Sequence, residues 1–274
     1  MNWLNNFKQG GSPCRQALAA LKGGSPGISP KVLFVYAVIL MAFSMPFKNR
    51  ITVYLIGDST MSIKQEKAYP ETGWGMPFVY FFDSTVTVDN RAQNGRSTRS
   101  FLEEKRWQPV VDALKEGDYV FVQFGHNDEV STKKTYTTED EFKTNLVKYV
   151  TETRDKKAIP VLLTPVARRK FNAAGKIEGT HEVYAEIVRK VANEYHIPLI
   201  DLDRKSQALL QELGEERSRL LFLHLAKGEH PNYPEGKEDN THFNELGARL
   251  MAQIVLAEIK TLKLELAERI VHRN

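Results

Sequence analysis

Residues 51–60 read ITVYLIGDST: six β-branched, aromatic or aliphatic residues that lead directly into Gly57-Asp58-Ser59-Thr60. A short, mostly apolar run that ends in turn-forming residues is typical of a strand buried in a parallel sheet. Similar runs recur along the chain, at 85–88 (TVTV), 119–124 (YVFVQF), 159–164 (IPVLLT) and 197–202 (IPLIDL). The pattern predicts five strands, of which the first ends at a Gly-Asp-Ser-Thr turn.

Helices are expected between these strands and after the last one, at 74–82, 109–115, 139–156, 180–195 and 245–262. In the last of them Leu246, Leu250 and Ile254 follow helical spacing, and Asn244 is the expected N-cap. Strands that alternate with helices predict an open, doubly wound α/β fold in a single domain. In such sheets the functional residues gather beyond the carboxyl ends of the strands.

The excess of basic over acidic residues lies entirely in the N-terminal segment of the chain. Residues 1–50 hold six of the 38 basic residues and none of the 34 acidic ones, which leaves 32 basic against 34 acidic residues in 51–274. The net charge of +4 therefore gives no support to a nucleic-acid partner, because the body of the protein is near neutral. Cys14 is the one cysteine of the sequence, so the body has neither a disulfide nor a thiol nucleophile.

Residues 32–47 (VLFVYAVILMAFSMPF) form an uncharged run that follows Lys31 and contains Ala42-Phe43-Ser44 as a small-x-small site. This pattern predicts a secretory signal and an extracytoplasmic protein, periplasmic or secreted. Two alternatives remain open for this run, an uncleaved membrane anchor and a buried helix. A membrane partner is expected only if the run is an uncleaved anchor. The expected organisation is a leader at 1–45, one domain at 50–262 and a C-terminal tail at 263–274.

Three of the chemically suggestive segments follow predicted strands. Ser59 can present its hydroxyl at the sheet edge, Gly95 in Asn94-Gly95-Arg96 lets the backbone approach a ligand, and Asn127 can aim its amide at a developing oxyanion. Taken alone, each is equally at home in a turn or a helix N-cap.

The fourth segment, Asp239-Asn240-Thr241-His242, precedes the last predicted helix. A serine nucleophile needs a histidine as general base, and that histidine needs a carboxylate on its other ring nitrogen. His242 and Asp239 meet this need within one local turn, although a charged turn leading into a helix has the same composition. The ordered set of all four segments indicates a serine esterase with Ser59, Asp239 and His242 as its catalytic triad.

In this order the motifs resemble those of the SGNH hydrolase superfamily, with Ser59, Gly95, Asn127 and His242 as the four named residues and Asp239 as the acid. The resemblance covers about residues 51–262. The segments GDST, ETGWGMPFVYFF, NRAQNGRSTRSF, VQFGHNDE and GKEDNTHFNELGA are similar to the rhamnogalacturonan acetylesterase branch.

This resemblance implies a flavodoxin-like three-layer α/β/α sandwich with a central five-stranded parallel sheet. It also implies removal of acetyl groups from pectic polysaccharide through an acetyl-enzyme. The oxyanion hole would consist of the Ser59 and Gly95 amides and the Asn127 side chain, with no metal or organic cofactor. Met76 departs from the branch, which has glutamine in its GWGQ motif.

Further expectations concern the substrate. The segment 223–240 is polar and rich in Gly and Pro, so we expect a functional loop in which Tyr233 contacts an acetylated polysaccharide. Trp74 is a second candidate contact, although an aromatic residue there also suits the core. His224 and His230 form no convincing zinc set, and neither G-x-S-x-G nor a nucleotide-binding glycine motif is present. A lipid or aryl-ester hydrolase on the same scaffold, and a catalytically silent carbohydrate-binding protein, remain alternatives.

Overall fold

The structure is a computed structural model that describes residues 49–271. The predicted leader, with its signal or anchor, lies outside the described residues and stays a prediction. Among residues 49–271 no helix combines the length and the apolar character that crossing a membrane requires.

The centre of the fold is a parallel sheet with the strand order β2-β1-β3-β4-β5. Its strands are β1 (Ile51–Gly57), β2 (Val86–Asn90), β3 (Tyr119–Gln123), β4 (Ile159–Leu163) and β5 (Leu199–Ile200). All five predicted strands are present, which confirms the five-stranded parallel sheet. β5 is shorter than predicted, because Pro198 has no N–H to donate and the Asp201 side chain already caps the next helix.

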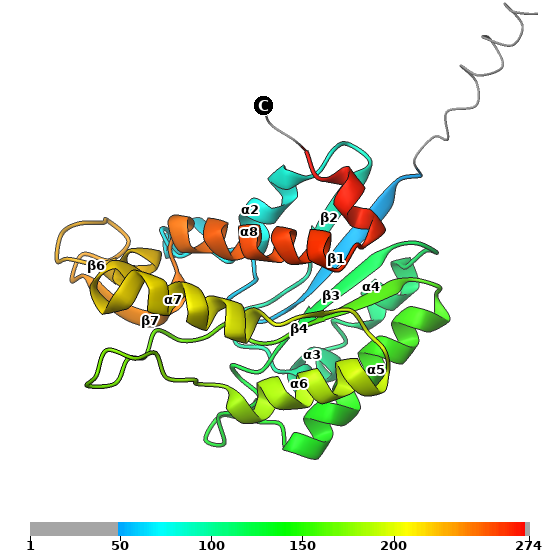
Figure 1. The fold of residues 1–274 in the computed structure, drawn as a ribbon, viewed down its shortest axis with the longest axis horizontal. Helices are drawn as coiled ribbons and strands as arrows, with labels where there is room; N and C mark the ends of the chain where they lie inside the picture. Colours follow the sequence, from blue (N-terminus) through cyan, green and yellow to red (C-terminus); the bar gives the residue numbers. More distant parts are fainter. Residues whose placement is uncertain (1–48, 272–274) are drawn as a thin grey trace, which may run out of the picture. The chain divides into compact units, whose positions relative to one another are not determined.

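Seven α-helices accompany the strands in the described part of the chain: α2 (Gly75–Phe78), α3 (Thr98–Glu103), α4 (Gln108–Ala113), α5 (Glu139–Asp155), α6 (Glu182–Glu194), α7 (Leu202–Ser218) and α8 (Glu245–Thr261). Figure 1 shows α2, α7 and α8 over one face of the sheet and α3 to α6 over the other. Alternate residues of β1, β3, β4 and β5 enter two separate cores: Leu55 belongs to the core that contains Met251 of α8, whereas Ile56 belongs to the core that contains Leu146 of α5. The predicted three-layer α/β/α sandwich is thereby confirmed.

Helix boundaries follow the predictions with two omissions. Asn244 caps α8 by accepting a hydrogen bond from the Gly247 N–H, as expected. The predicted helix at 74–82 is divided into α2 and the 3-10 helix η4 (Val79–Phe81). Sequence reasoning missed α3, which has only six residues, and α7, which is kinked at Gly214 (φ 71°).

The segment 223–240 is not the loop that we expected. Its ends form the antiparallel hairpin of β6 (Phe222–Leu225) and β7 (Lys237–Phe243). In Figure 1 this hairpin lies beyond the carboxyl ends of the parallel strands. Phe222 pairs with Phe243 but Leu223 pairs with Asp239, so residues 240–242 bulge out of the ladder. The polar composition of β7 gave no strand signal, because Phe243 is the one residue of this strand that is buried.

Most of the predicted tail belongs to the folded domain. Residues Glu265–Arg269 form the 3-10 helix η6, and Leu266 and Ile270 are buried in the core on the α8 side. The Arg269 guanidinium donates to the carbonyl oxygen of Asn49 (2.6 Å), and the Val271 N–H donates to the carbonyl of Phe81 (2.9 Å). The domain therefore extends to residue 271 in the described chain.

Candidate active site

Ser59 stands on a tight turn at the carboxyl end of β1. The carbonyl of Asp58 accepts hydrogen bonds from the N–H groups of Met61 (3.3 Å) and Ser62 (3.1 Å). Gly57 is required for the close approach of β1 to β3, because a Cβ atom there would lie 2.5 Å from the carbonyl oxygen of Gln123. No helix begins at Ser59 in the described chain; the next helical residues are Glu66–Ala68 of the 3-10 helix η3. The turn alone presents the half-buried Ser59 side chain at the sheet edge.

Ser59, His242 and Asp239 form one hydrogen-bonded chain. Ser59 Oγ lies 2.9 Å from His242 Nε2, and His242 Nδ1 lies 2.9 Å from Asp239 Oδ2. Residues three apart in a regular strand point to opposite faces and lie about 10 Å apart, so they could not make this contact. The bulge at 240–242 turns His242 back toward Asp239. Irregular pairing of β7, and not a helix-leading turn, therefore brings the acid to the histidine.

The Asp239 carboxylate is held in its ionised form. Burial raises the pKa of this carboxyl, but hydrogen bonds from the His242 ring and from the backbone N–H groups of His242 and Thr241 outweigh burial and hold it well below its ordinary value. An ionised carboxylate only accepts hydrogen bonds, so His242 Nδ1 carries the proton. Nε2 is then free to accept a proton from Ser59.

Asn127 follows β3 and is held at both ends of its amide. Its Nδ2 donates to the carbonyl of Arg96 (3.1 Å), and its Oδ1 accepts from the ammonium of Lys133 (3.1 Å). One N–H of the amide is left for a ligand. Gly95, at φ 75°, precedes Arg96 on an exposed turn. The loops after β2 and β3 therefore contact each other, as expected for segments that follow the carboxyl ends of neighbouring strands in a parallel sheet.

A buried carboxylate, which the sequence reasoning missed, ties these two loops to each other. Asp128 accepts hydrogen bonds from the N–H and hydroxyl of Thr98 (2.8 and 2.6 Å) and from the N–H of Gly125 (3.1 Å). Burial raises the pKa of Asp128 to about 7. Asp128 directly follows Asn127 in GHNDE, and this position was the feature of the sequence that could have identified it.

The two predicted substrate contacts differ in exposure: Trp74 is fully buried, whereas Tyr233 is half-buried and stays a prediction. Trp74 as a stacking residue is wrong, because its ring is fully buried and its Nε1 donates to Gln123 Oε1 (2.6 Å). Close packing enforces this: a Cβ at Gly73 would lie 2.1 Å from the carbonyl oxygen of Ser62. Tyr233 is half-buried, and its hydroxyl donates to the carbonyl of Ala68 (2.8 Å). Tyr233 thus fastens the hairpin to the segment that follows the Ser59 turn.

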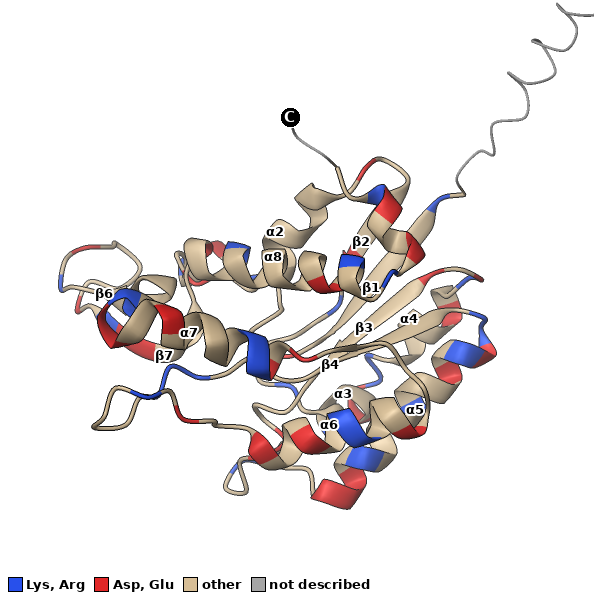
Figure 2. Cartoon of the chain, in the orientation of Figure 1, with Lys and Arg blue, Asp and Glu red and all other residues tan. Residues whose placement is uncertain are grey.

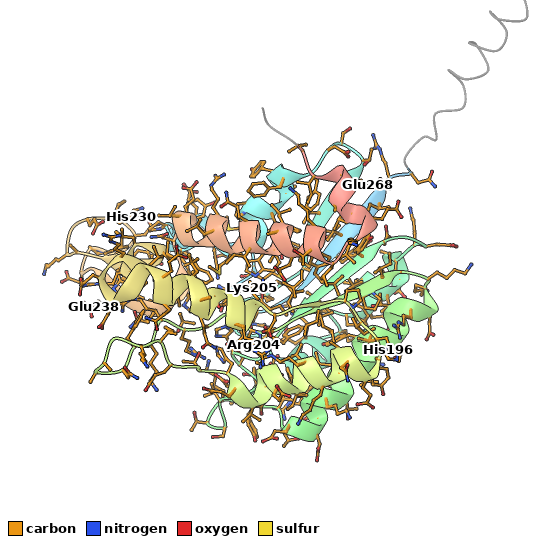
Figure 3. All side chains as sticks on the ribbon, in the orientation of Figure 1. His196, Arg204, Lys205, His230, Glu238 and Glu268 are labelled. Atoms are coloured by element: carbon orange, nitrogen blue, oxygen red, sulfur yellow. The ribbon has the colours of Figure 1, made fainter. Side chains whose placement is uncertain are left out.

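The side chains of His224 and His230 each have one hydrogen-bonding partner within the hairpin. His224 Nε2 lies 2.8 Å from Asn240 Oδ1, and His230 Nδ1 accepts from the N–H of Asn232 (3.1 Å). Figure 3 shows His230 and Glu238 on the hairpin side of the molecule. Across residues 49–271 no three His, Cys, Asp or Glu side chains are grouped to hold a metal ion.

Known proteins are similar to this chain in sequence and in fold. Residues 55–250 match the model of the GDSL-like Lipase/Acylhydrolase family. The rhamnogalacturonan acetylesterase RhgT of Bacillus subtilis (strain 168) is 41% identical over 228 residues, 83% of this chain and 97% of the relative. The probable rhamnogalacturonan acetylesterase YesY of the same organism is 36% identical over 224 residues, 80% of this chain and 97% of the relative.

Solved structures extend the likeness to the fold. The structure of protein YxiM from Bacillus subtilis superimposes with a TM-score of 0.68 at 28% identity and covers 80% of this chain and 58% of its own. The acetylxylan esterase Axe2 from Geobacillus stearothermophilus gives 0.56 at 18% identity, over 84% of this chain and all of its own. The likeness to Axe2 concerns the fold alone.

Proposed function

Because the chain belongs to the GDSL-like lipase/acylhydrolase family of carboxylic ester hydrolases, we propose that it removes acetyl groups from a pectic polysaccharide, rhamnogalacturonan. The observation that carries the chemistry is the unbroken hydrogen-bonded chain from Ser59 through His242 to Asp239. The substrate class is supported by the two relatives, 41% and 36% identical, that are named as established and probable rhamnogalacturonan acetylesterases.

The proposed reaction has two steps, acylation and deacylation, and both use the hydrogen-bonded Ser59, His242 and Asp239. His242 Nε2 takes the proton from Ser59 as its Oγ attacks the acetyl carbonyl, and Asp239 stabilises the imidazolium that forms. The tetrahedral oxyanion is held by the backbone N–H groups of Ser59 and Gly95 and by the remaining N–H of the Asn127 amide. The bond between the acetyl carbon and the sugar oxygen then breaks, and His242 gives its proton to that sugar oxygen. Water, activated by the same histidine, attacks the acetyl-enzyme and releases acetate.

The position of Lys133 suits an acidic polymer. Lys133 is exposed beside Asn127, and within residues 49–271 its ammonium has no carboxylate partner. Figure 2 shows basic and acidic residues interspersed on α5, α6 and α7. A galacturonate carboxylate near the acetylated hydroxyl could therefore pair with Lys133.

The experiment that tests the function measures acetate release from acetylated rhamnogalacturonan and acetylated xylan, together with 4-nitrophenyl esters from acetate to octanoate. We expect acetate to be preferred, butyrate to be poor and octanoate inert, with all activity lost in Ser59→Ala. A lipase-like channel would gain about 0.8 kcal/mol for each buried methylene, so kcat/KM would rise with chain length. Such a rise, with no acetate freed from any pectic fraction, would reassign the enzyme to lipid esters.

Lys133→Gln distinguishes the acidic polysaccharide from a small uncharged ester within the same panel. If Lys133 pairs with uronate, the substitution should lower kcat/KM on rhamnogalacturonan about tenfold more than on 4-nitrophenyl acetate. A difference of this size corresponds to the loss of about one charged hydrogen bond. Added salt should shrink that difference. Equal losses on both substrates would count against uronate recognition by Lys133.

A further inference from the structure

Lys64 is a buried cation that joins three segments around the nucleophile. Its side chain is only 1% exposed, and its ammonium donates to the carbonyl oxygen of Ser59 (2.6 Å) and to Asn94 Oδ1 (2.8 Å). The third partner is the carboxylate of Glu71, at 2.7 Å. An ammonium has three N–H groups, so all of them are used.

The stability of the loop does not by itself account for a lysine here. Burial lowers the pKa of Lys64, which reflects the cost of removing an ammonium from water. The effective cost of burying an ion is several kcal/mol, and well-packed hydrophobic residues often replace buried ion pairs without loss of stability. What a hydrophobic side chain would not supply is a set of three directed hydrogen bonds.

Two of the three partners of Lys64, Ser59 and Asn94, carry or adjoin the backbone donors of the proposed oxyanion hole. Ser59 contributes one N–H, and the bond to its carbonyl fixes the orientation of the same residue. Asn94 precedes Gly95, which contributes the second N–H, and the Asn94 side chain also accepts from the hydroxyl of Ser62. The ammonium thus lies between the nucleophile turn and the loop after β2.

We propose that Lys64 is a positioning residue whose ammonium sets the distance between the Ser59 and Gly95 backbone amides and so shapes the oxyanion hole. The inference rests on the proposed function, in which these amides bind the oxyanion. Lys64 itself touches no substrate atom in this scheme. Its effect is exerted on the transition state through the backbone that it holds.

The test uses Lys64→Met, which keeps the length of the side chain and removes its donors. Misplacement of a catalytic group by about 1 Å costs about 10² in rate, so kcat on 4-nitrophenyl acetate should fall about 100-fold. KM should change little, because the interaction is made in the transition state. Phenylboronic acid, which forms a tetrahedral adduct on a nucleophilic serine, should bind more weakly by a similar factor.

A matched control is Arg269→Met at the other end of β1. Arg269 is also a buried cation, 5% exposed, and it donates to the Asn49 carbonyl and to Thr85 Oγ1. Figure 3 places its neighbour Glu268 on the side of the molecule away from His230. Arg269→Met should lower the melting temperature while leaving kcat and boronate affinity unchanged. Equal kinetic losses in both variants would mean that Lys64 acts only through stability.

The double variant Lys64→Met/Glu71→Gln removes the carboxylate that the single variant leaves without its cation. A loss of kcat that persists in the double variant supports positioning by the ammonium. Recovery of kcat would overturn the inference, because the loss in Lys64→Met would then come from the unpaired Glu71 carboxylate. If Lys64→Met does not fold, Asn94→Ala tests the same link at an exposed residue, with an expected loss of about tenfold in kcat when the acceptor shared by Lys64 and Ser62 is removed. Unchanged kcat in Asn94→Ala, or in a folded Lys64→Met, would overturn the inference.

Ser59→Ala in the same assays keeps the two proposals apart. Turnover by a folded Ser59→Ala protein would overturn the proposed function itself. An inactive Ser59→Ala beside a fully active Lys64→Met would overturn only the role of Lys64.

Discussion

Asn127 is oriented by contacts at both ends of its side-chain amide, to the Arg96 carbonyl and the Lys133 ammonium. A group held in this way is preorganised, so its remaining N–H needs no reorganisation as the oxyanion forms. Asn127→Ala should lower kcat by about 10²–10³ with little change in KM, which steady-state kinetics on 4-nitrophenyl acetate will show. A change confined to KM would make Asn127 a substrate-binding residue instead.

Asp239 links the active site to the pH dependence of stability. Its folded-state pKa lies below the value of about 3.9 expected for the unfolded chain, so the unfolded state binds more protons as the pH falls. The contribution of Asp239 to the free energy of unfolding is therefore complete above about pH 5 and is lost as the pH falls below about 4. Urea unfolding at pH 3 to 7 should show the difference between wild type and Asp239→Asn shrinking at the acid end. A difference that stays constant over this range would contradict the prediction.

At the scale of elements, the β6–β7 hairpin performs two tasks. Its bulge aligns Asp239 with His242, and its connecting loop is tied to the segment after the Ser59 turn. The amide of Asn232 donates to the carbonyls of Glu66 (2.8 Å) and Tyr69 (3.0 Å), beside the Tyr233 bond to Ala68. Three hydrogen bonds therefore hold the loop against residues 66–69, and we expect it to serve as a fixed wall for a polysaccharide substrate and not as a mobile flap.

Tyr233→Phe tests this wall by removing one hydroxyl. We expect the loss of about 1 kcal/mol of local stability, seen as faster amide hydrogen exchange in residues 226–236. KM for the polysaccharide should rise a few-fold, because a loosened wall positions a long substrate less well, whereas kcat on 4-nitrophenyl acetate should stay within about twofold of wild type. Unchanged exchange would show that the two Asn232 bonds hold the loop without Tyr233.

At the scale of the whole molecule, the folded domain is closed by residues from both ends of the described chain. Asn49 and Arg269 are 220 positions apart and hydrogen-bonded, so η6 completes the core beside the start of β1. The assembled domain thus begins almost immediately after the apolar run at 32–47.

We propose that this run is a cleaved export signal and that the enzyme acts outside the cytoplasm. Protein recovered from the extracytoplasmic fraction should then begin shortly after Ser44, as N-terminal sequencing or intact mass will show. An intact, membrane-bound form would identify an anchor instead. Intact Met1 on a protein found only in the cytoplasm would overturn export altogether.

Local pattern alone was enough for the five parallel strands, the long helices α5, α6 and α8 and the placement of Ser59, Gly95 and Asn127 after strands. These features depend on periodicity and on turn residues close in the sequence, and strands of a parallel sheet bring their carboxyl ends to one edge whatever their loops do. The order of the polar motifs also indicated a serine esterase before any contact was known.

Only the tertiary structure revealed the bulged hairpin, the burial of Trp74 and the three-way contact of Lys64. Each of these depends on partners distant in the sequence: β7 pairs with β6 across a connecting loop, Trp74 Nε1 binds Gln123, and Lys64 reaches Asn94. A polar strand such as β7 carries no periodic apolar signal, and a lysine in a loop is ordinarily solvated. Whether such residues are exposed or buried is decided when distant segments meet, because only then is their hydration exchanged for specific hydrogen bonds.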